Sequence, residues 1–313
     1  MEETERIQYE EEQTCIEPMA APTKAQMRRT FSRLALGLCL GLLFAQLAPN
    51  MVTAIAPGFN TNAHAFLLGS LSLVCFTLPL MLLLTLKLPT RKPEKNSLSV
   101  GILLALVCIS YAGMIAGNMV GILVNSVLSP GSMSLVNDLT TSSEDLVELS
   151  ITLLLMAPVF EELVFRKILV DKVLPYGEWP AILFAGITFG LFHGNLTQFF
   201  YATLLGVLLA YVYIRTGNIL YNIVIHACIN LLGGILPTLM PAAAPFFVLL
   251  APAGVALFFI LRKRIHVEKN AAPGVGAAMF GNGGMILLLL ISGLLMALVA
   301  YVMNHPELLN GLG

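Results

Sequence analysis

The sequence predicts an all-α protein, a polytopic bundle of about eight to nine transmembrane helices. Composition is the first observation behind this prediction: 57% of the 313 residues are hydrophobic and 11% are charged, with a mean hydropathy of +0.85. About a quarter of the residues in a soluble domain are charged. The second observation is a series of nine apolar runs, most of them near the roughly 20 residues that a spanning helix needs. The solvent for most of this chain is therefore lipid.

The apolar runs follow one another with short connections. They cover residues 34–56, 66–86, 98–128, 147–170, 179–195, 199–214, 218–237, 245–261 and 283–303. The third run is long enough to form a tilted helix, or one kinked at a glycine. The chain divides into a tail (1–32), N-terminal transmembrane helices (33–146), core helices (147–238) and C-terminal transmembrane helices (239–313).

The tail is acidic. It contains seven of the 18 acidic residues, namely Glu2, Glu3, Glu5, Glu10, Glu11, Glu12 and Glu17. A segment with this charge and few apolar residues cannot bury enough surface to fold, so we expect a disordered cytoplasmic tail. No basic segment followed by a short apolar run and a cleavage site begins the chain, so the first apolar run is expected to remain as a transmembrane helix.

Lys and Arg predict how the helices are oriented, because these residues collect in cytoplasmic loops. They precede the first run, lie between the second and third, end the fourth and sixth, and follow the eighth. The intervening connections and the segment after Tyr301 contain neither residue. Together with the short loops, this pattern predicts a multi-pass protein of a bacterial plasma membrane, with a cytoplasmic N-terminus and an external C-terminus.

Each ionisable residue inside an apolar run costs a few kcal/mol of free energy on insertion into the membrane. Such residues therefore indicate either a functional interior or a structural ion pair. Apart from Glu148 at the edge of a run, three stretches contain them. They are Glu161, Glu162 and Arg166 in the fourth run, His193 in the fifth, and His226, accompanied by Asn230, in the seventh. Each has a purely structural interpretation, as an ion pair, a capping residue or an interhelical hydrogen bond. Their convergence on three neighbouring helices favours a functional site.

Helical geometry sorts these side chains, because residues four apart share a face and adjacent residues are about 100° apart. Glu162 and Arg166 are predicted to pair along one helix. Glu161 then points elsewhere and is free to act toward another helix. His226 and Asn230 present an imidazole and an amide from a single face.

The depth of the site follows from counting residues. Phe189 lies one turn before His193 and is placed to shield the imidazole. Glu161 and His193 both lie roughly 21 to 24 Å from the hairpin tip near Pro175, so they can meet. His226 lies about 14 Å from its own turn, so it joins them only if the first hairpin projects further. The count also puts His193 at the outer end of its helix, and it leaves open which membrane face the site opens to.

Two kinds of hydrolytic chemistry fit this set. A carboxylate beside a neutral His can deprotonate a water, while a second His and an Asn can stabilise an oxyanion, which together describe amide hydrolysis. Glu161, His193 and His226 also have the composition of an open catalytic zinc site, which makes zinc the alternative cofactor. The spacing does not separate the two, because there is no H-E-x-x-H helix.

The ordered motifs Glu161-Glu162-x-x-x-Arg166, Phe189-x-x-x-His193 and His226-x-x-x-Asn230 resemble the signature of the type II CAAX prenyl endopeptidases, also called CPBP intramembrane proteases. The resemblance covers roughly residues 147–235 and makes residues 147–238 a CAAX-protease-like core. It implies that Glu161 and His193 activate the water, that His226 and Asn230 form the oxyanion hole, and that Glu162 and Arg166 support Glu161. Members of the family have been described both as metalloproteases and as glutamate-dependent proteases.

The predicted function is an intramembrane endopeptidase acting on a membrane-associated protein or peptide, with a CAAX-type or bacteriocin-like substrate. Its partners are that substrate and the lipid bilayer, not nucleic acid. Two other functions use the same polar cluster. A transporter would be expected to have inverted repeats with paired broken helices, and the sequence contains no second copy of the cluster. A catalytically idle bacteriocin-immunity or scaffold protein would bind a membrane partner without turnover.

Overall fold

The computed structural model describes residues 22–59, 64–128 and 146–305, and every regular element in these ranges is a helix. The all-α prediction is confirmed. The N-terminal part contains α2 (Lys24–Ile55), α3 (Ala65–Ser72), η1 (Leu73–Thr77), α4 (Leu78–Thr85) and α5 (Val100–Leu128). The core contains α7 (Leu146–Ile151), η2 (Thr152–Met156), α8 (Ala157–Glu162), η3 (Leu163–Val170), α9 (Asp171–Val173), η4 (Leu174–Tyr176), α10 (Glu178–Phe192), α11 (Leu196–Thr216), α12 (Ile219–Asn230), η5 (Leu231–Ile235) and α13 (Leu236–Leu239).

The C-terminal part contains η6 (Pro241–Ala243), α14 (Ala244–Val248), α15 (Leu250–Leu261), η7 (Arg262–Arg264), α16 (Val275–Phe280) and α17 (Gly283–Asn304). Within the described ranges, seven helices are long and apolar enough to cross a membrane. The fourth and fifth predicted runs are helical but are not among these seven. The fifth run forms α10, whose 15 residues span only about 22 Å, less than the roughly 30 Å hydrocarbon core. The protein is an integral, multi-pass membrane protein.

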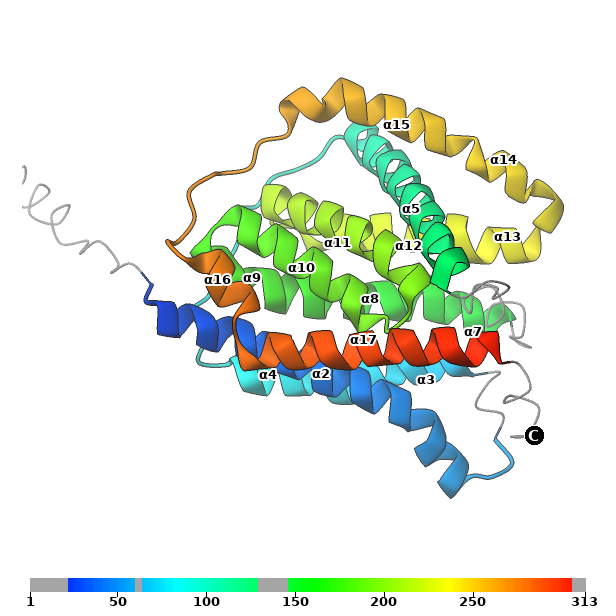
Figure 1. The fold of residues 1–313 in the computed structure, drawn as a ribbon. Helices are drawn as coiled ribbons and strands as arrows, with labels where there is room; N and C mark the ends of the chain where they lie inside the picture. The colour runs from blue at the N-terminus through cyan, green and yellow to red at the C-terminus, as the bar shows by residue number, and fades with distance from the viewer. Residues whose placement is uncertain (1–21, 60–63, 129–145, 306–313) are drawn as a thin grey trace, which may run out of the picture.

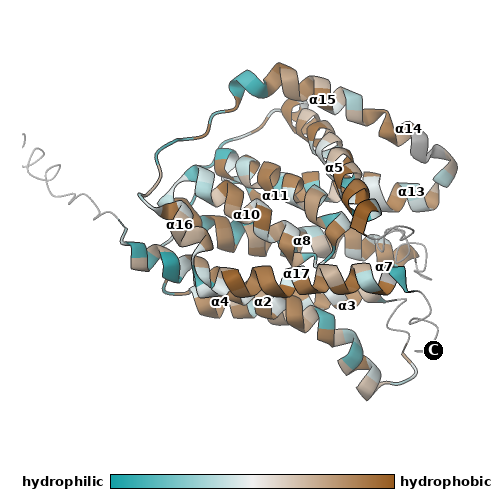
Figure 2. Cartoon of the chain, viewed as in Figure 1, coloured by the Kyte–Doolittle hydropathy of each residue, from teal (hydrophilic) through white to brown (hydrophobic). Residues whose placement is uncertain are grey.

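Figure 1 shows how the helices pack in the bundle. α11 packs against α10 on one side and against α5 on the other, α15 covers α5, and α17 packs along α2. α5 crosses its neighbours diagonally, as expected for a 29-residue helix that is longer than the bilayer is thick. Figure 2 shows that the helices are predominantly hydrophobic along their length, with hydrophilic residues near the start of α2 and the end of α15.

The first helix begins earlier than its apolar run. Thr23 and Gln26 form a reciprocal capping box that starts α2 at Lys24, and Met27 and Phe31 are buried on its first turns. Residues 24–32 are therefore helical, and the tail predicted over residues 1–32 is shorter by that much. Residues 24–32 do not form a continuous apolar run, because only one face of this part of the helix is buried and basic and polar residues occupy most of the rest. The apolar runs therefore did not predict where the helix begins. Residues 1–21 of the predicted tail lie outside the described ranges.

Three of the four π-helical segments that the structure describes precede a proline. Pro79, Pro158 and Pro237 lie just after η1, η2 and η5. Proline lacks the N–H that an α-helix would donate to the carbonyl four residues earlier, and its ring clashes with that carbonyl. A π-helical turn widens the helix at this point and accommodates the proline. η3, which begins after Glu162, has no such proline within it.

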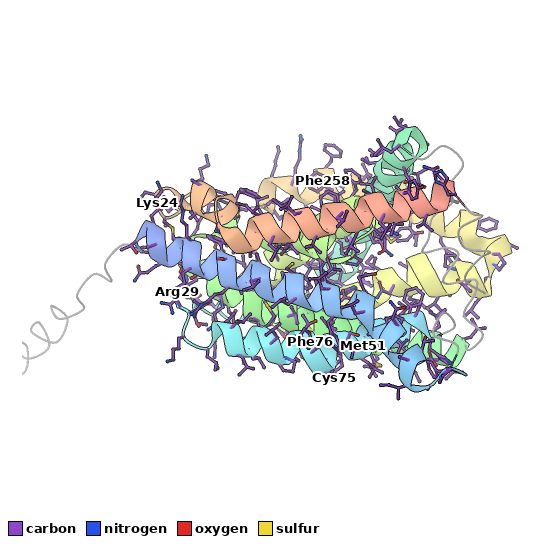
Figure 3. The ribbon with its side chains drawn as sticks, turned by 60° about the horizontal axis from the view of Figure 1, so that its bottom comes forward. Lys24, Arg29, Met51, Cys75, Phe76 and Phe258 are labelled. Carbon is purple, nitrogen blue, oxygen red and sulfur yellow. The ribbon has the colours of Figure 1, made fainter. Side chains whose placement is uncertain are left out.

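The predicted cytoplasmic connections meet at one end of the molecule. The backbone N–H of Arg91 donates to Asp171, that of Asn96 donates to Thr216, and that of Ala272 donates to Tyr176. Figure 3 shows Lys24 and Arg29 at one end of α2, with Met51 far along the same helix. Segments from four different connections are thus joined through main-chain hydrogen bonds.

Charged side chains strengthen this basic end. Arg215 forms an ion pair with Glu178, whose carboxylate also accepts a hydrogen bond from the backbone of Glu268 at 2.8 Å. Asp171 accepts from Tyr213 at 2.9 Å and pairs with Lys167 at 3.2 Å. Burial raises the pKa of the Asp171 carboxyl, and these two partners oppose the shift.

Close packing of α5 on α11 depends on Gly117. A Cβ added there would meet the backbone and Cβ of Tyr201. We expect Gly117→Leu to lower the free energy of unfolding by about 1–3 kcal/mol, the usual cost of overpacking, as measured by denaturant titration in detergent. Gly113→Leu is the matched control on the same helix, because a Cβ at Gly113 meets nothing within 4 Å. Equal stability of the two variants would contradict this role.

Candidate active site

A cavity of about 320 Å³ lies among the core helices, α3 and α5. It is lined by Glu161 from α8, His193 after α10, and His226 and Asn230 from α12, together with Phe189. The four predicted catalytic side chains therefore share one cavity. Its volume falls at the lower end of the roughly 300–1,000 Å³ typical of ligand pockets, which suits a short stretch of extended chain.

Adjacent carboxylates on α8 have different surroundings. The Glu161 side chain is 20% exposed and faces the cavity, whereas the Glu162 side chain is fully buried. Glu162 Oε1 lies 3.1 Å from Nη1 of Arg166, which is also fully buried. The predicted pair of residues four apart is present, and the other carboxylate is left to the cavity.

His226 lies between the two carboxylates. Its Nδ1 is 2.9 Å from Glu162 Oε1, and its Nε2 is 3.8 Å from Glu161 Oε2. A carboxylate paired with Arg166 is ionised and only accepts hydrogen bonds, so Nδ1 of His226 carries the proton. Nε2 can then donate to an oxyanion only when the ring is an imidazolium.

His193 also carries its proton on Nδ1. Its Nδ1 lies 2.7 Å from the backbone carbonyl oxygen of Phe189, and a carbonyl can only accept. Nδ1 therefore holds the proton of the neutral ring, and Nε2 keeps a lone pair that can accept a proton from water. The turn that carries His193 is set by Gly194 with φ of +60° and by Asn195, which caps α11.

Phe189 contacts both imidazoles and the arginine of the ion pair. Its ring makes edge contacts with His193 and His226, at centroid distances of 5.0 and 5.8 Å. The Arg166 guanidinium carbon lies 4.8 Å above the same ring, close enough for a cation–π interaction. The shielding expected of Phe189 thus extends to both histidines and to the arginine.

Asn230 lines the cavity and also donates from Nδ2 to the carbonyl oxygen of Leu153 at 2.8 Å. Ala157 N–H bonds to Thr152 O five residues earlier in the π-helical turn. The next donor in that pattern would be Pro158, which has no N–H. Asn230 therefore satisfies the carbonyl that Pro158 leaves without a helical partner.

We expect Asn230→Ala to lower the free energy of unfolding by about 1 kcal/mol, because it leaves the Leu153 carbonyl without this donor. Pro158→Ala restores a backbone N–H at the same place. The double variant should therefore be more stable than the sum of the two single effects predicts, as a double-mutant cycle of unfolding free energies would measure. Strict additivity would contradict the link between these two residues.

The zinc alternative stays a prediction. In the ranges that the structure describes, no group of three or more His, Cys, Asp or Glu side chains lies close enough to hold a metal ion. Glu161, His193 and His226 share a cavity, but Nδ1 of His226 faces Glu162 and its Nε2 faces Glu161 at 3.8 Å. In both histidines Nδ1 is hydrogen-bonded, so Nε2 is the ring nitrogen that could face a zinc ion.

A further polar part of the cavity was missed by sequence reasoning. It comprises Ser70, Asn118, Thr152, Gln198 and Tyr201. Asn118 was detectable as an amide in the middle of an apolar run, whereas the others have no signal that distinguishes them from ordinary helix residues. The search for ionisable groups passed over all five because they are uncharged at neutral pH.

Comparison with known protein families agrees with the signature. Residues 144–232 match the family model described as type II CAAX prenyl endopeptidase, Rce1-like. This segment is an Rce1-like domain. Searches of curated proteins and of solved structures found no match. The Rce1-like domain includes all four cavity side chains of the predicted site, and it covers less than a third of the chain.

The similarity to CAAX-type intramembrane proteases rests on residues 144–232. The helices outside the domain also contribute to the cavity, since Ser70 of α3 and Asn118 of α5 line it. Their sequence is not covered by the family model.

Proposed function

We propose that this protein is an intramembrane endopeptidase that hydrolyses a peptide bond of a membrane-associated protein or peptide, with a CAAX-type or bacteriocin-like substrate. One observation carries the proposal: Glu161 shares the cavity with His193, while the adjacent Glu162 is buried against Arg166 and His226. This division leaves one carboxylate available as a base and gives it a neighbouring lone-pair nitrogen.

Water activation is the first step of the proposed mechanism. A water bound between the carboxylate of Glu161 and Nε2 of His193 gives a proton to Glu161 as its oxygen attacks the peptide carbonyl carbon. The carbonyl electron pair moves onto oxygen. The tetrahedral oxyanion accepts hydrogen bonds from Nε2–H of the His226 imidazolium and from the second amide hydrogen of Asn230.

Collapse of the intermediate completes the reaction. The carbonyl re-forms, the bond to nitrogen breaks, and the proton held by Glu161 passes to the leaving amine. The products are the amine and a carboxylic acid that keeps the second proton of the water, and Glu161 returns to its ionised form. Arg166 keeps Glu162 ionised throughout, which holds the His226 ring in one orientation through Nδ1.

The proposal is tested with purified protein and a panel of membrane-anchored peptides. We expect the wild type to cleave at least one peptide. We expect His193→Ala to lose that cleavage, because Nε2 no longer accepts the hydrogen bond that holds the water beside Glu161. A chelator should leave the wild-type rate unchanged. Loss of activity on chelation would require a metal centre, and cleavage that persists in His193→Ala would contradict the mechanism.

No cleavage of any peptide would favour the idle scaffold or immunity function. A transporter would need a path for its substrate that opens at both ends of the bundle. Between Glu162 and the basic end, however, Val164, Phe165 and Leu169 are fully buried in the hydrophobic core. The structure therefore supports a closed reaction site better than a path across the membrane.

A further inference from the structure

The basic end of the molecule indicates which side of the membrane each end of the bundle faces. The connections rich in Lys and Arg are joined there by the hydrogen bonds from Arg91, Asn96 and Ala272. Figure 1 places α9, α16 and the start of α2 at that end, and α7 and α13 at the opposite end. Because basic loops remain cytoplasmic, the opposite end faces the outside of the cell.

A packed plug closes the site toward the basic end. Past Glu162, the chain of η3 and α9 contributes Val164, Phe165, Leu169 and Val173, all with no exposed surface. The arginine paired with Glu162 is fully buried in the same layer. A peptide therefore cannot reach Glu161 from the cytoplasmic side without displacing this fully buried layer of the core.

The cavity extends in the other direction. Gly69 and Phe66 line it from α3, which begins at the end remote from the basic loops. Thr152 of η2 and Gly233 of η5 also line this part of the cavity. A Cβ added to Gly69 would meet nothing within 4 Å, so this wall of the cavity borders open space.

We propose that the substrate reaches Glu161 from the extracytoplasmic side, so that the cleaved segment of a membrane-anchored polypeptide lies in or near the outer leaflet. Of the two substrate types in the proposed function, this direction fits the bacteriocin-like one, because a CAAX-type substrate is reached from the cytosol. This inference rests on the proposed protease function. The cavity wall is built largely of small and apolar residues, with Gly69, Ala65 and Gly233 among them. The segment that enters is therefore a short extended stretch with small or apolar side chains.

Sided thiol labelling tests the direction of access without relying on activity. Phe66→Cys and Lys263→Cys are made in a chain whose native cysteines are replaced by serine or alanine, and a membrane-impermeant maleimide is added to right-side-out or inside-out vesicles. We expect Phe66→Cys to react only in right-side-out vesicles and Lys263→Cys only in inside-out vesicles. Reaction of both cysteines from the same side, or of Phe66→Cys from neither, would overturn the inference.

Cleavage provides the second test. The probe is an acyl-anchored peptide with a fluorophore and a quencher on either side of an Ala-Val-Leu segment. We expect right-side-out vesicles to cleave it and Gly69→Trp to lose this cleavage. Gly293→Trp, at an exposed glycine of α17 with no atom within 4 Å of an added Cβ, should retain it. Cleavage only in inside-out vesicles would overturn the direction, whereas no cleavage from either side would contradict the protease function and leave the labelling result to decide access.

Discussion

Glu161→Gln is expected to abolish most peptide cleavage while leaving the fold intact. The substitution keeps the size of the side chain but removes the group that takes the proton from water, and a general base contributes roughly 10²–10⁴-fold to a rate. Glu161 is 20% exposed to the cavity, and the ion pair that the structure gives it is the 3.8 Å contact with His226. Loss of the Glu161 carboxylate should therefore lower kcat and change the free energy of unfolding little.

The adjacent carboxylate supplies the matched control. Glu162→Gln alters a fully buried side chain that contacts both Arg166 and His226, so its first effect should be on stability. Turnover numbers and unfolding midpoints measured for both variants separate the two roles. Wild-type turnover by Glu161→Gln, with the same peptide and detergent, would rule out this residue as the base.

Arg166→Met is expected to destabilise the protein more than Gly117→Leu or Asn230→Ala does. It leaves the Glu162 carboxylate buried without its cation and removes the cation from the Phe189 ring. Breaking a buried pair in this way costs about 3–5 kcal/mol. Denaturant titration in bicelles would measure the loss as a change in the free energy of unfolding.

Removing both charges should restore much of that stability. In Glu162→Gln with Arg166→Met, no ion remains unpaired, and the Gln amide oxygen can still accept from Nδ1 of His226. The double variant is therefore expected to be more stable than Arg166→Met alone. If its stability equals the sum of the two single losses, the two side chains are not coupled and the ion pair is not what holds this layer together.

The sequence identified the members of the site but not their bonding. The spacing of four residues correctly paired Glu162 with Arg166 and separated Glu161 from both. It also placed His226 and Asn230 on one face as equivalent donors. In the structure, His226 bridges the two glutamates, and Asn230 bonds the carbonyl of Leu153. Such contacts join helices far apart in the chain, and periodicity within one helix carries no information about them.

Depth in the membrane was likewise decided by tertiary structure. Counting 1.5 Å per residue left His226 short of Glu161, but that count assumes straight α-helices. The chain after Glu162 is π-helical over Leu163–Val170 and ends in a tight 3₁₀ turn, so residue number does not measure height along the bundle there. In the structure, His226 Nε2 lies 3.8 Å from Glu161 Oε2.

The sequence by itself determined the bundle of apolar helices, the basic end and the identities of the polar side chains, because burial in lipid and charge outside it follow directly from composition. The tertiary structure decided which carboxylate faces the cavity, which carbonyl Asn230 satisfies, and toward which end the cavity extends. Those outcomes depend on how prolines widen three helices and how closely glycines let neighbours approach. Both effects act between helices, and the sequence pattern within one helix carries no information about them.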